Sequence, residues 1–195
     1  MSENGNFITI KRETKETQIE LTLGLGGNRN CDIATGVGFF DHMLQALFFH
    51  GGFDVKIVAK GDIEVEPHHL VEDVGIVIGD ALKALFEKNK QIVRFSSFIV
   101  PMDEALAQAV VDYCGRAYLV YRAEYPQPRC GEFDMSLIRE FFYALAIHGN
   151  CTLHLEVLYG ENSHHMSEAL FKAVGKALAA ALQPQAGVPS TKGSL

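Results

Sequence analysis

The sequence predicts an α+β fold of two internally duplicated half-domains, each a small mixed four-stranded sheet with two helices on one face. One observation behind this is an internal repeat, in which four segments recur in the same order and at nearly the same spacing. The other is that, in each half, segments in which apolar and polar residues alternate, as in strands, are followed by segments in which apolar residues recur at helical spacing. The repeat pairs residues 46–51 with 144–149, 53–59 with 151–158, 68–72 with 164–168, and 79–82 with 175–178.

The two halves are expected to meet between residues 89 and 92. Residues 1–90 would form the first half-domain, and residues 91–195 the second half-domain with a C-terminal phosphate-binding tail. A chain of 195 residues is long enough for one ordinary domain or two small related ones. We expect the two halves to pack into one compact unit.

Each half is expected to hold two strands, a helix, a further strand and a second helix. Alternation and β-branched residues predict strands at residues 7–12, 17–23 and 54–60, then at 98–100, 107–112 and 152–157. Helical spacing, as of Phe39, Met43 and Leu47, predicts the helices. They are residues 38–49 and 68–86, then 135–147 and 164–182.

The composition is that of a water-soluble globular protein, with 48% hydrophobic and 21% charged residues. A net charge of −7 argues against a general nucleic-acid binder, which needs a basic surface. No apolar run approaches the ~18 residues of a membrane span, and the polar first residues lack the layout of a signal peptide. The four cysteines are scattered, as free thiols of an intracellular protein would be. We expect a cytoplasmic protein with no nucleic-acid or membrane partner.

The strongest chemical signal is the motif His-His-x-x-Glu, which occurs twice. Each residue of a helix turns by about 100°, so His68 and Glu72 share a face and can bind one ion. His69 points to another side and cannot easily reach that ion. A single copy would be weak evidence, because adjacent surface histidines are common. Two copies in register within a repeat indicate metal binding.

The second copy has the same geometry, with His164 and Glu168 on one face and His165 aside. If the two helix starts face each other, the spare histidines can cross over. Metal one would take His68, Glu72 and His165, and metal two would take His164, Glu168 and His69. Imidazole and carboxylate ligands without thiolate suit manganese, iron, nickel or zinc, and such sites with open positions are catalytic.

His42 lies on the first helix and is the expected fourth ligand of metal two, with Asp41 as a residue that could orient it. A lone histidine on an apolar helix can equally be a packed core residue. The repeat aligns His42 with Glu140, which could bind metal one.

A second group of residues is basic and includes the C-terminal tail. Ser190 and Lys192, with a glycine beside them, offer donors to an oxyanion such as phosphate. Taken alone, this segment could be a disordered tail. Lys172 stands four residues after Glu168 and could bind phosphate or form a surface ion pair. Arg94 and Arg116 could join the group.

These segments together resemble the imidazoleglycerol-phosphate dehydratase family. The resemblance covers the chain from Phe7 to Leu195 in the family's order. The segments that carry it are residues 12–17, 39–44, 61–62 with 68–73, 101–106, 115–116, 164–168 with 171–173, and 189–193.

The resemblance implies two manganese ions per site and a shell of 24 subunits, with sites formed between neighbouring subunits. The metal ligands would be His42, His68, His69, Glu72, His164, His165 and Glu168, and an eighth family position, often histidine, is Glu140 here. The substrate contacts would be Glu16, His50, Arg94, Arg116, Lys172, Ser190 and Lys192.

The implied reaction is the dehydration of D-erythro-imidazoleglycerol phosphate to imidazole-acetol phosphate in histidine biosynthesis. It removes a hydrogen that no carbonyl group acidifies. Metals on the two ring nitrogens would stabilise an imidazolate, which can expel the neighbouring hydroxyl. Glu168 or Glu16 would act as the acid/base, and the basic residues would hold the phosphate.

Two other readings stay open. A dinuclear metallohydrolase acting on a phosphate ester would share the metals and the basic residues. A metal-binding or storage shell without enzyme activity would share the metals, but it leaves Ser190, Lys192 and Arg116 without a role.

Overall fold

The computed structural model describes residues 7–88, 90–187 and 190. Each half forms a four-stranded sheet with one topology, in the order β1-β2-β4-β3 and β5-β6-β10-β7. The strands of the first sheet are β1 (Phe7–Glu13), β2 (Thr17–Gly24), β3 (Cys31–Ala34) and β4 (Asp54–Gly61). Those of the second are β5 (Phe95–Met102), β6 (Ala105–Asp112), β7 (Tyr118–Arg122) and β10 (Thr152–Tyr159). A short ribbon is made by β8 (Arg129–Cys130) and β9 (Phe133–Asp134).

Both sheets are mixed, as expected. Three strands of each are antiparallel, while β3 pairs with β4 and β7 pairs with β10 in parallel. The edge strands β3 and β7 are the fourth strands that the sequence left unplaced, and β8 and β9 were also not located. Only four residues long, β3 has too few positions for its alternation to stand out.

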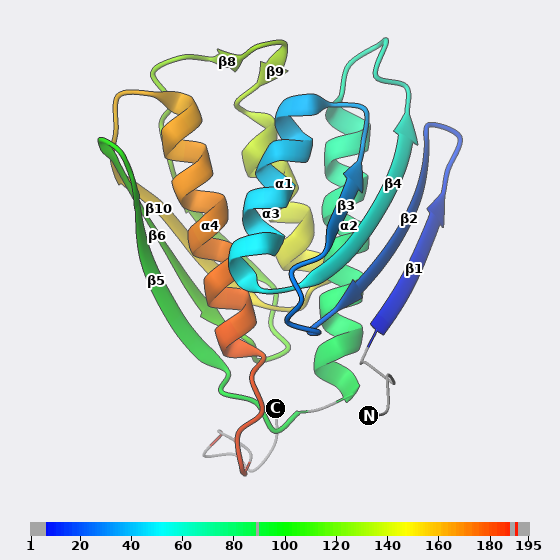
Figure 1. The fold of residues 1–195 in the computed structure, drawn as a ribbon, viewed down its shortest axis with the longest axis vertical. Coiled ribbons are helices and arrows are strands. Elements are labelled where there is room, and N and C mark those ends of the chain that lie inside the picture. The colour runs from blue at the N-terminus through cyan, green and yellow to red at the C-terminus, as the bar shows by residue number, and fades with distance from the viewer. Residues whose placement is uncertain (1–6, 89, 188–189, 191–195) are drawn as a thin grey trace.

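The four helices fill the space between the two sheets, as Figure 1 shows. They are α1 (Gly38–Gly51), α2 (His68–Lys88), α3 (Leu137–His148) and α4 (Ser163–Ala181). All four lie at the expected places, with ends that differ by one or two residues. The helices α1 and α2 contact the first sheet, and α3 and α4 contact the second. Each sheet therefore has its helices on one face and leaves its other face outward.

Helices pair across the two halves. The first helix of one half packs on the second helix of the other, α1 on α4 and α2 on α3. Aromatic side chains join these pairs in the core, where the ring of Phe141 lies 5.3 Å from Phe40 and 5.5 Å from Phe171. Because the helices bury their apolar faces on one another, the two halves share one hydrophobic core.

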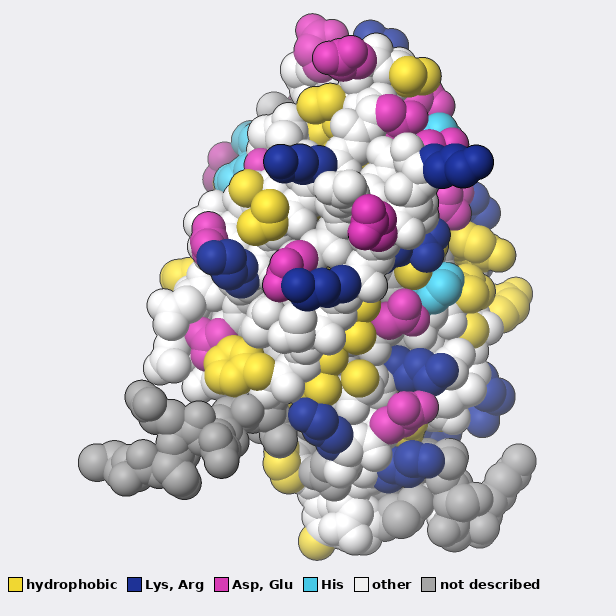
Figure 2. All heavy atoms as spheres, turned by 90° about the vertical axis from the view of Figure 1, so that its right-hand side faces the viewer, with side chains coloured by type: hydrophobic (Ala, Val, Ile, Leu, Met, Phe, Trp, Pro, Cys, Tyr) yellow, Lys and Arg dark blue, Asp and Glu magenta, His cyan; other side chains and the backbone are white. Residues whose placement is uncertain are grey.

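The outer face of the first sheet is polar. Figure 2 shows basic and acidic side chains interspersed over this side of the molecule. Among them Lys11 lies 3.1 Å from Glu20, and Lys56 lies 3.3 Å from Asp32. Among the described residues no helix is long and apolar enough to cross a membrane.

Glycines at matching positions of the repeat lie where the paired helices approach each other closely. A Cβ on Gly175 of α4 would overlap the carbonyl oxygen of Leu47 in α1. In the other pair, a Cβ on Gly79 of α2 would lie 2.8 Å from the carbonyl oxygen of Leu145 in α3. Gly79 and Gly175 occupy matching positions of the sequence repeat, so the same close approach explains both.

We predict that Gly175→Ala destabilises the protein by about 1–3 kcal/mol, because α4 must move away from the backbone of α1. The control is Gly38→Ala in α1, where a Cβ meets nothing within 4 Å. That change should be neutral or stabilise by up to about 1 kcal/mol through helix propensity. Urea unfolding of the metal-free variants at one protein concentration measures both. Equal stability of the two variants would show that the helix pair has room for a methyl group.

Candidate active site

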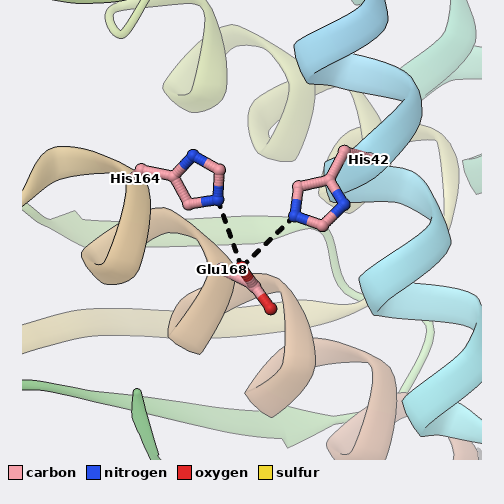
Figure 3. Close-up of side chains that lie close together, drawn as sticks. All are labelled: His42, His164 and Glu168. Atoms are coloured by element: carbon pink, nitrogen blue, oxygen red, sulfur yellow. Dashed lines mark hydrogen bonds and ion pairs between the residues drawn. The ribbon is translucent and has the colours of Figure 1, made fainter. Parts of the chain in front are cut away.

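The pairing of α1 with α4 brings three of the expected metal ligands together. Nε2 of His42 lies 3.3 Å from Oε2 of Glu168, and Nε2 of His164 lies 3.2 Å from the same oxygen. Figure 3 shows both imidazoles directed at this carboxylate. Within the described residues, they form the only group of three or more His, Cys, Asp or Glu side chains whose ligand atoms all lie within 4.8 Å.

Local structure fixes the start of each helix of this cluster. Asn162 caps α4, because its side-chain oxygen accepts hydrogen bonds from the backbone N–H groups of His164 and His165. Before α1, the carboxylate of Asp41 accepts hydrogen bonds from the N–H of Thr35 at 2.9 Å and from its hydroxyl at 2.5 Å. Asp41 thus holds the turn into α1, rather than orienting His42 as the sequence suggested.

The second oxygen of Glu168 is held by Lys172, whose Nζ lies 2.7 Å from Oε1. These side chains are 16% and 12% exposed, so the pair is mostly buried and is not the surface pair considered from the sequence. Burial alone would raise the pKa of Glu168, but the hydrogen bonds from Lys172 and His42 outweigh it and lower the pKa. Glu168 is therefore ionised at neutral pH and suited to binding a cation.

His50 lies in the last turn of α1. Its pKa is lowered, first by burial and then by the positive charges of Lys172 and Lys176. His50 therefore tends to stay neutral near pH 7. A neutral ring donates a hydrogen bond through one nitrogen and accepts one through the other.

The first copy of the motif is more open. Nε2 of His68 lies 4.0 Å from Oε2 of Glu72, and both side chains are more than a third exposed. Nδ1 of His69 lies 3.2 Å from Asp62 and 3.7 Å from Glu16, two carboxylates of the same half. The structure therefore places His69 beside Asp62 and Glu16 and not in the cluster around Glu168.

His165 is likewise separate from the ligands that the sequence assigned to it. Its Nδ1 lies 2.7 Å from Oε2 of Glu104, and its Nε2 lies 3.9 Å from Asp103. The hydrogen bond from His165 and those from the backbone lower the pKa of Glu104 to about 2. Glu104 is therefore a permanent negative charge beside His165 at neutral pH.

Glu140 does not join His68 and Glu72 within 4.8 Å in the described chain. Its carboxylate instead lies 3.0 Å from the guanidinium of Arg139. It lines an open cavity of about 800 Å³ that also includes Tyr121 and Tyr125.

Two of the expected phosphate contacts, Arg94 and Arg116, lie toward the other end of α4, whereas Lys172 lies beside Glu168. Nε of Arg94 is 2.7 Å from Asp112, and the guanidinium of Arg116 is 3.5 Å from the same carboxylate. The backbone N–H of Arg94 donates to the carbonyl of Ala181, the last residue of α4. Ser190 follows this helix and is partly exposed. Lys192 lies outside the described residues.

Sequence reasoning missed three acidic residues around the histidines. Asp62 and Glu104 contact the second histidine of each motif, and Asp73 of α2 binds the hairpin that carries Glu16. Asp62, Asp73 and Glu104 all stand in segments that carried the family resemblance. They could have been noted there, but sequence alone does not show which side chains they meet.

Comparison with known proteins places the chain in a family. The sequence model described as imidazoleglycerol-phosphate dehydratase matches residues 35–178. The chain belongs to the imidazoleglycerol-phosphate dehydratase family. Enzymes of this family act in histidine biosynthesis.

Relatives named imidazoleglycerol-phosphate dehydratase match almost the whole chain. That of Rhodopseudomonas palustris strain HaA2 is 50% identical over 191 residues, which are 96% of this chain and 97% of the relative. That of Lacticaseibacillus casei strain BL23 is 52% identical over 188 residues, 95% of this chain and 97% of the relative. The crystal structure of imidazoleglycerol-phosphate dehydratase from Staphylococcus aureus subsp. aureus N315 matches with a TM-score of 0.84 and 38% identity, covering 92% of this chain and 99% of that one.

We predict that Lys172→Met raises the pKa of His50 toward its ordinary value, because a positive charge that disfavours the imidazolium is lost. Titration of the His50 ring protons by NMR, in metal-free protein, measures this shift. Lys176→Met is the matched control and should give a smaller rise in the pKa of His50, since the charge of Lys176 affects His50 less than that of Lys172 does. A larger rise in the Lys176 variant would contradict the placement of Lys172 beside His50.

Proposed function

We propose that this chain dehydrates D-erythro-imidazoleglycerol phosphate to imidazole-acetol phosphate, acting as a metal-dependent hydro-lyase of histidine biosynthesis. The observation that carries the proposal is the cluster of His42, His164 and Glu168 in a chain of the imidazoleglycerol-phosphate dehydratase family. A metallohydrolase or a storage protein would fit the cluster alone, but family membership favours the dehydratase. The cytoplasmic location and the assembly of 24 subunits stay predictions.

The donor atoms of the cluster fit a divalent transition metal. Two imidazole nitrogens converge on one oxygen of an ionised carboxylate, and the group includes no thiolate. This mixture suits manganese, and we propose two Mn²⁺ per site. When bound, the metals supply positive charge that stabilises the electron-rich imidazole ring of the substrate. The cluster would form part of the site of metal two, and His68 and Glu72 would begin the site of metal one.

The two carboxylates proposed for proton transfer differ in their surroundings. Glu168 is held by Lys172, His42 and His164, which suits it to binding a cation. Glu16 lies 3.7 Å from His69 at the end of the β1–β2 hairpin, with 55% of its side chain exposed. Because Glu16 is less constrained, we assign it the transfer of the carbon-bound proton.

The distance along α4 supports sites shared between subunits. His164 lies at the first turn of this 19-residue helix, and Arg94 is hydrogen-bonded to its last residue. A helix of this length spans about 28 Å at 1.5 Å per residue. Both motif helices begin at one end of the molecule, while the C-terminal end of α4 lies at the other (Figure 1). A small substrate cannot reach both ends, so we propose that a second copy supplies the phosphate contacts of Arg94 and Arg116.

The spare histidines support the same conclusion. His69 and His165 lie apart from the glutamates of the opposite motif within one chain, so the crossed metal sites would need another copy. Metal one would then combine His68 and Glu72 with a neighbour's His165. Metal two would combine the Glu168 cluster with a neighbour's His69. Glu140 would reach metal one only by leaving Arg139.

The first test is turnover. Purified protein should convert imidazoleglycerol phosphate to a ketone, lose activity after chelation, and regain it with Mn²⁺. The metals are needed because no carbonyl of the substrate acidifies the departing proton. Release of inorganic phosphate without ketone would indicate the metallohydrolase, and metal binding without turnover would indicate the storage protein. Full activity in metal-free protein would overturn the proposed metal role.

Shared sites predict complementation between damaged chains. Glu168→Gln removes the metal cluster and Arg116→Ala removes a phosphate contact, so each variant alone should be nearly inactive. Mixed after metal removal and reassembled with Mn²⁺, they should recover up to about a quarter of wild-type activity, because a quarter of the neighbour pairs combine the two intact ends. The assay is ketone formation by the mixture.

The matched control mixes Glu168→Gln with His164→Ala. Both changes damage the cluster that a single chain builds, so no chain in this mixture carries an intact one. Its activity should stay at background. Failure of the first mixture to recover activity, while mass spectrometry finds mixed oligomers, would contradict sites shared in this way.

A further inference from the structure

The histidines of the two motifs use their ring nitrogens in two different ways. His42, His68 and His164 turn Nε2 toward a glutamate of a motif. His69 and His165, the second histidine of each motif, have Nδ1 taken by a carboxylate outside the motif. A neutral histidine whose Nδ1–H donates to a carboxylate has a free electron pair on Nε2, which is the form that binds a metal.

Glu104 is built firmly into this position. It lies at the turn between β5 and β6, and its Oε1 accepts hydrogen bonds from the backbone N–H groups of Glu161 at 3.1 Å and Asn162 at 2.8 Å. Its Oε2 is thereby left to accept from Nδ1 of His165 at 2.7 Å. The hairpin is fixed to the start of α4, where Asn162 also caps the backbone of His165.

The corresponding carboxylate of the first half comes from a different place in the fold. Asp62 follows β4, and its two oxygens lie 3.2 Å and 3.4 Å from Nδ1 of His69. Glu104 follows β5, so the two carboxylates do not occupy matching positions of the repeat. Both halves nevertheless place a carboxylate on the same ring nitrogen. The turn that matches that of Glu104 lies between β1 and β2 and carries Glu16, which is 3.7 Å from Nδ1 of His69. Asp62 lies closer to this nitrogen and makes the hydrogen bond, so each half holds the second histidine of its motif by a carboxylate.

We infer that Glu104 and Asp62 are positioning residues, which hold His165 and His69 with Nε2 unprotonated and directed outward to a metal of a neighbouring copy. The inference rests on the proposed function and assigns roles to two residues outside the ligand set. Asp103, 3.9 Å from Nε2 of His165, lies on the side where the metal would bind.

The two carboxylates differ in how they would respond to conversion to an amide. In Glu104→Gln, the amide oxygen must keep accepting from the two backbone N–H groups, so its NH₂ group faces Nδ1 of His165. The ring then accepts at Nδ1 and carries its proton on Nε2, which blocks metal binding. In Asp62→Asn, the described contacts of the side chain are to His69 alone. The amide can therefore turn its oxygen to Nδ1 and preserve the metal-binding form.

The experiment measures ring protonation and metal binding separately from activity. Nitrogen-15 NMR of histidine-labelled, metal-free protein above the histidine pKa reports which ring nitrogen carries the proton. Equilibrium dialysis at fixed free Mn²⁺ gives the affinity of each site. Glu104→Gln should move the proton of His165 to Nε2 and weaken one of the two Mn²⁺ sites by about 10- to 100-fold. Asp62→Asn should stay close to wild type, whereas Asp62→Ala should weaken one site.

Exposed glutamates nearby provide matched controls for the loss of charge. Glu161→Gln and Glu66→Gln each remove one negative charge near His165 or His69, and both should bind Mn²⁺ as the wild type does. The fold of Glu104→Gln is checked by thermal unfolding of the metal-free protein, which should be unchanged because the backbone hydrogen bonds remain.

The possible results distinguish a failure of the inference from a failure of the proposed function. Wild-type binding of two Mn²⁺ per chain with unchanged affinity in Glu104→Gln would overturn the inference and leave the proposed function standing. Equal weakening in Glu104→Gln and Glu161→Gln would also overturn it, because charge alone would then account for the effect. Failure of the wild type to bind Mn²⁺ would overturn both.

Discussion

Close packing of helices across the two halves is the constraint on which the rest of the structure depends. Gly175 lets α4 approach the backbone of α1, and Gly79 does the same for α2 and α3. A half-domain alone would expose the apolar face of its two helices, so neither half has a complete core without the other. The same crossing sets His42 of the first half beside His164 and Glu168 of the second. The cluster of His42, His164 and Glu168 is thus a direct product of core packing.

A partly buried ion pair connects this core to the residues at its edge. Asp73 stands one turn after His69 on α2, binds Arg12 at 2.9 Å and accepts a hydrogen bond from Thr17. These contacts fix both strands of the β1–β2 hairpin, which carries Glu16 at its turn. Removing one partner would leave a charge with little access to water, so such pairs hold geometry more than they add stability. The hairpin carrying Glu104 is fixed in a similar way in the second half.

The residues of the proposed site lie at two ends of the single chain. The side chains proposed to bind metal gather where the motif helices begin, and Arg94 and Arg116 gather on Asp112 near the end of α4. The helix between them keeps these ends apart because its backbone hydrogen bonds make it stiff along its axis. Under the proposed function, a substrate that needs both groups would bind between copies of the chain. Assembly and catalysis would then be controlled by the same ligands.

The sequence by itself determined the duplicated α+β fold, the four helices, six of the strands and the family, because periodicity, repeats and motifs are properties of neighbouring residues. It also paired His164 with Glu168, since helical geometry relates residues four positions apart. It did not locate β3 and β7, which are short edge strands. The tertiary structure alone decided that Lys172 holds Glu168, that Asp41 holds Thr35, and that Glu104 and Asp62 face the spare histidines. Some of these contacts join residues from different elements, and in others one side chain has several possible partners. Only the packing of the folded chain settles which partner each side chain meets.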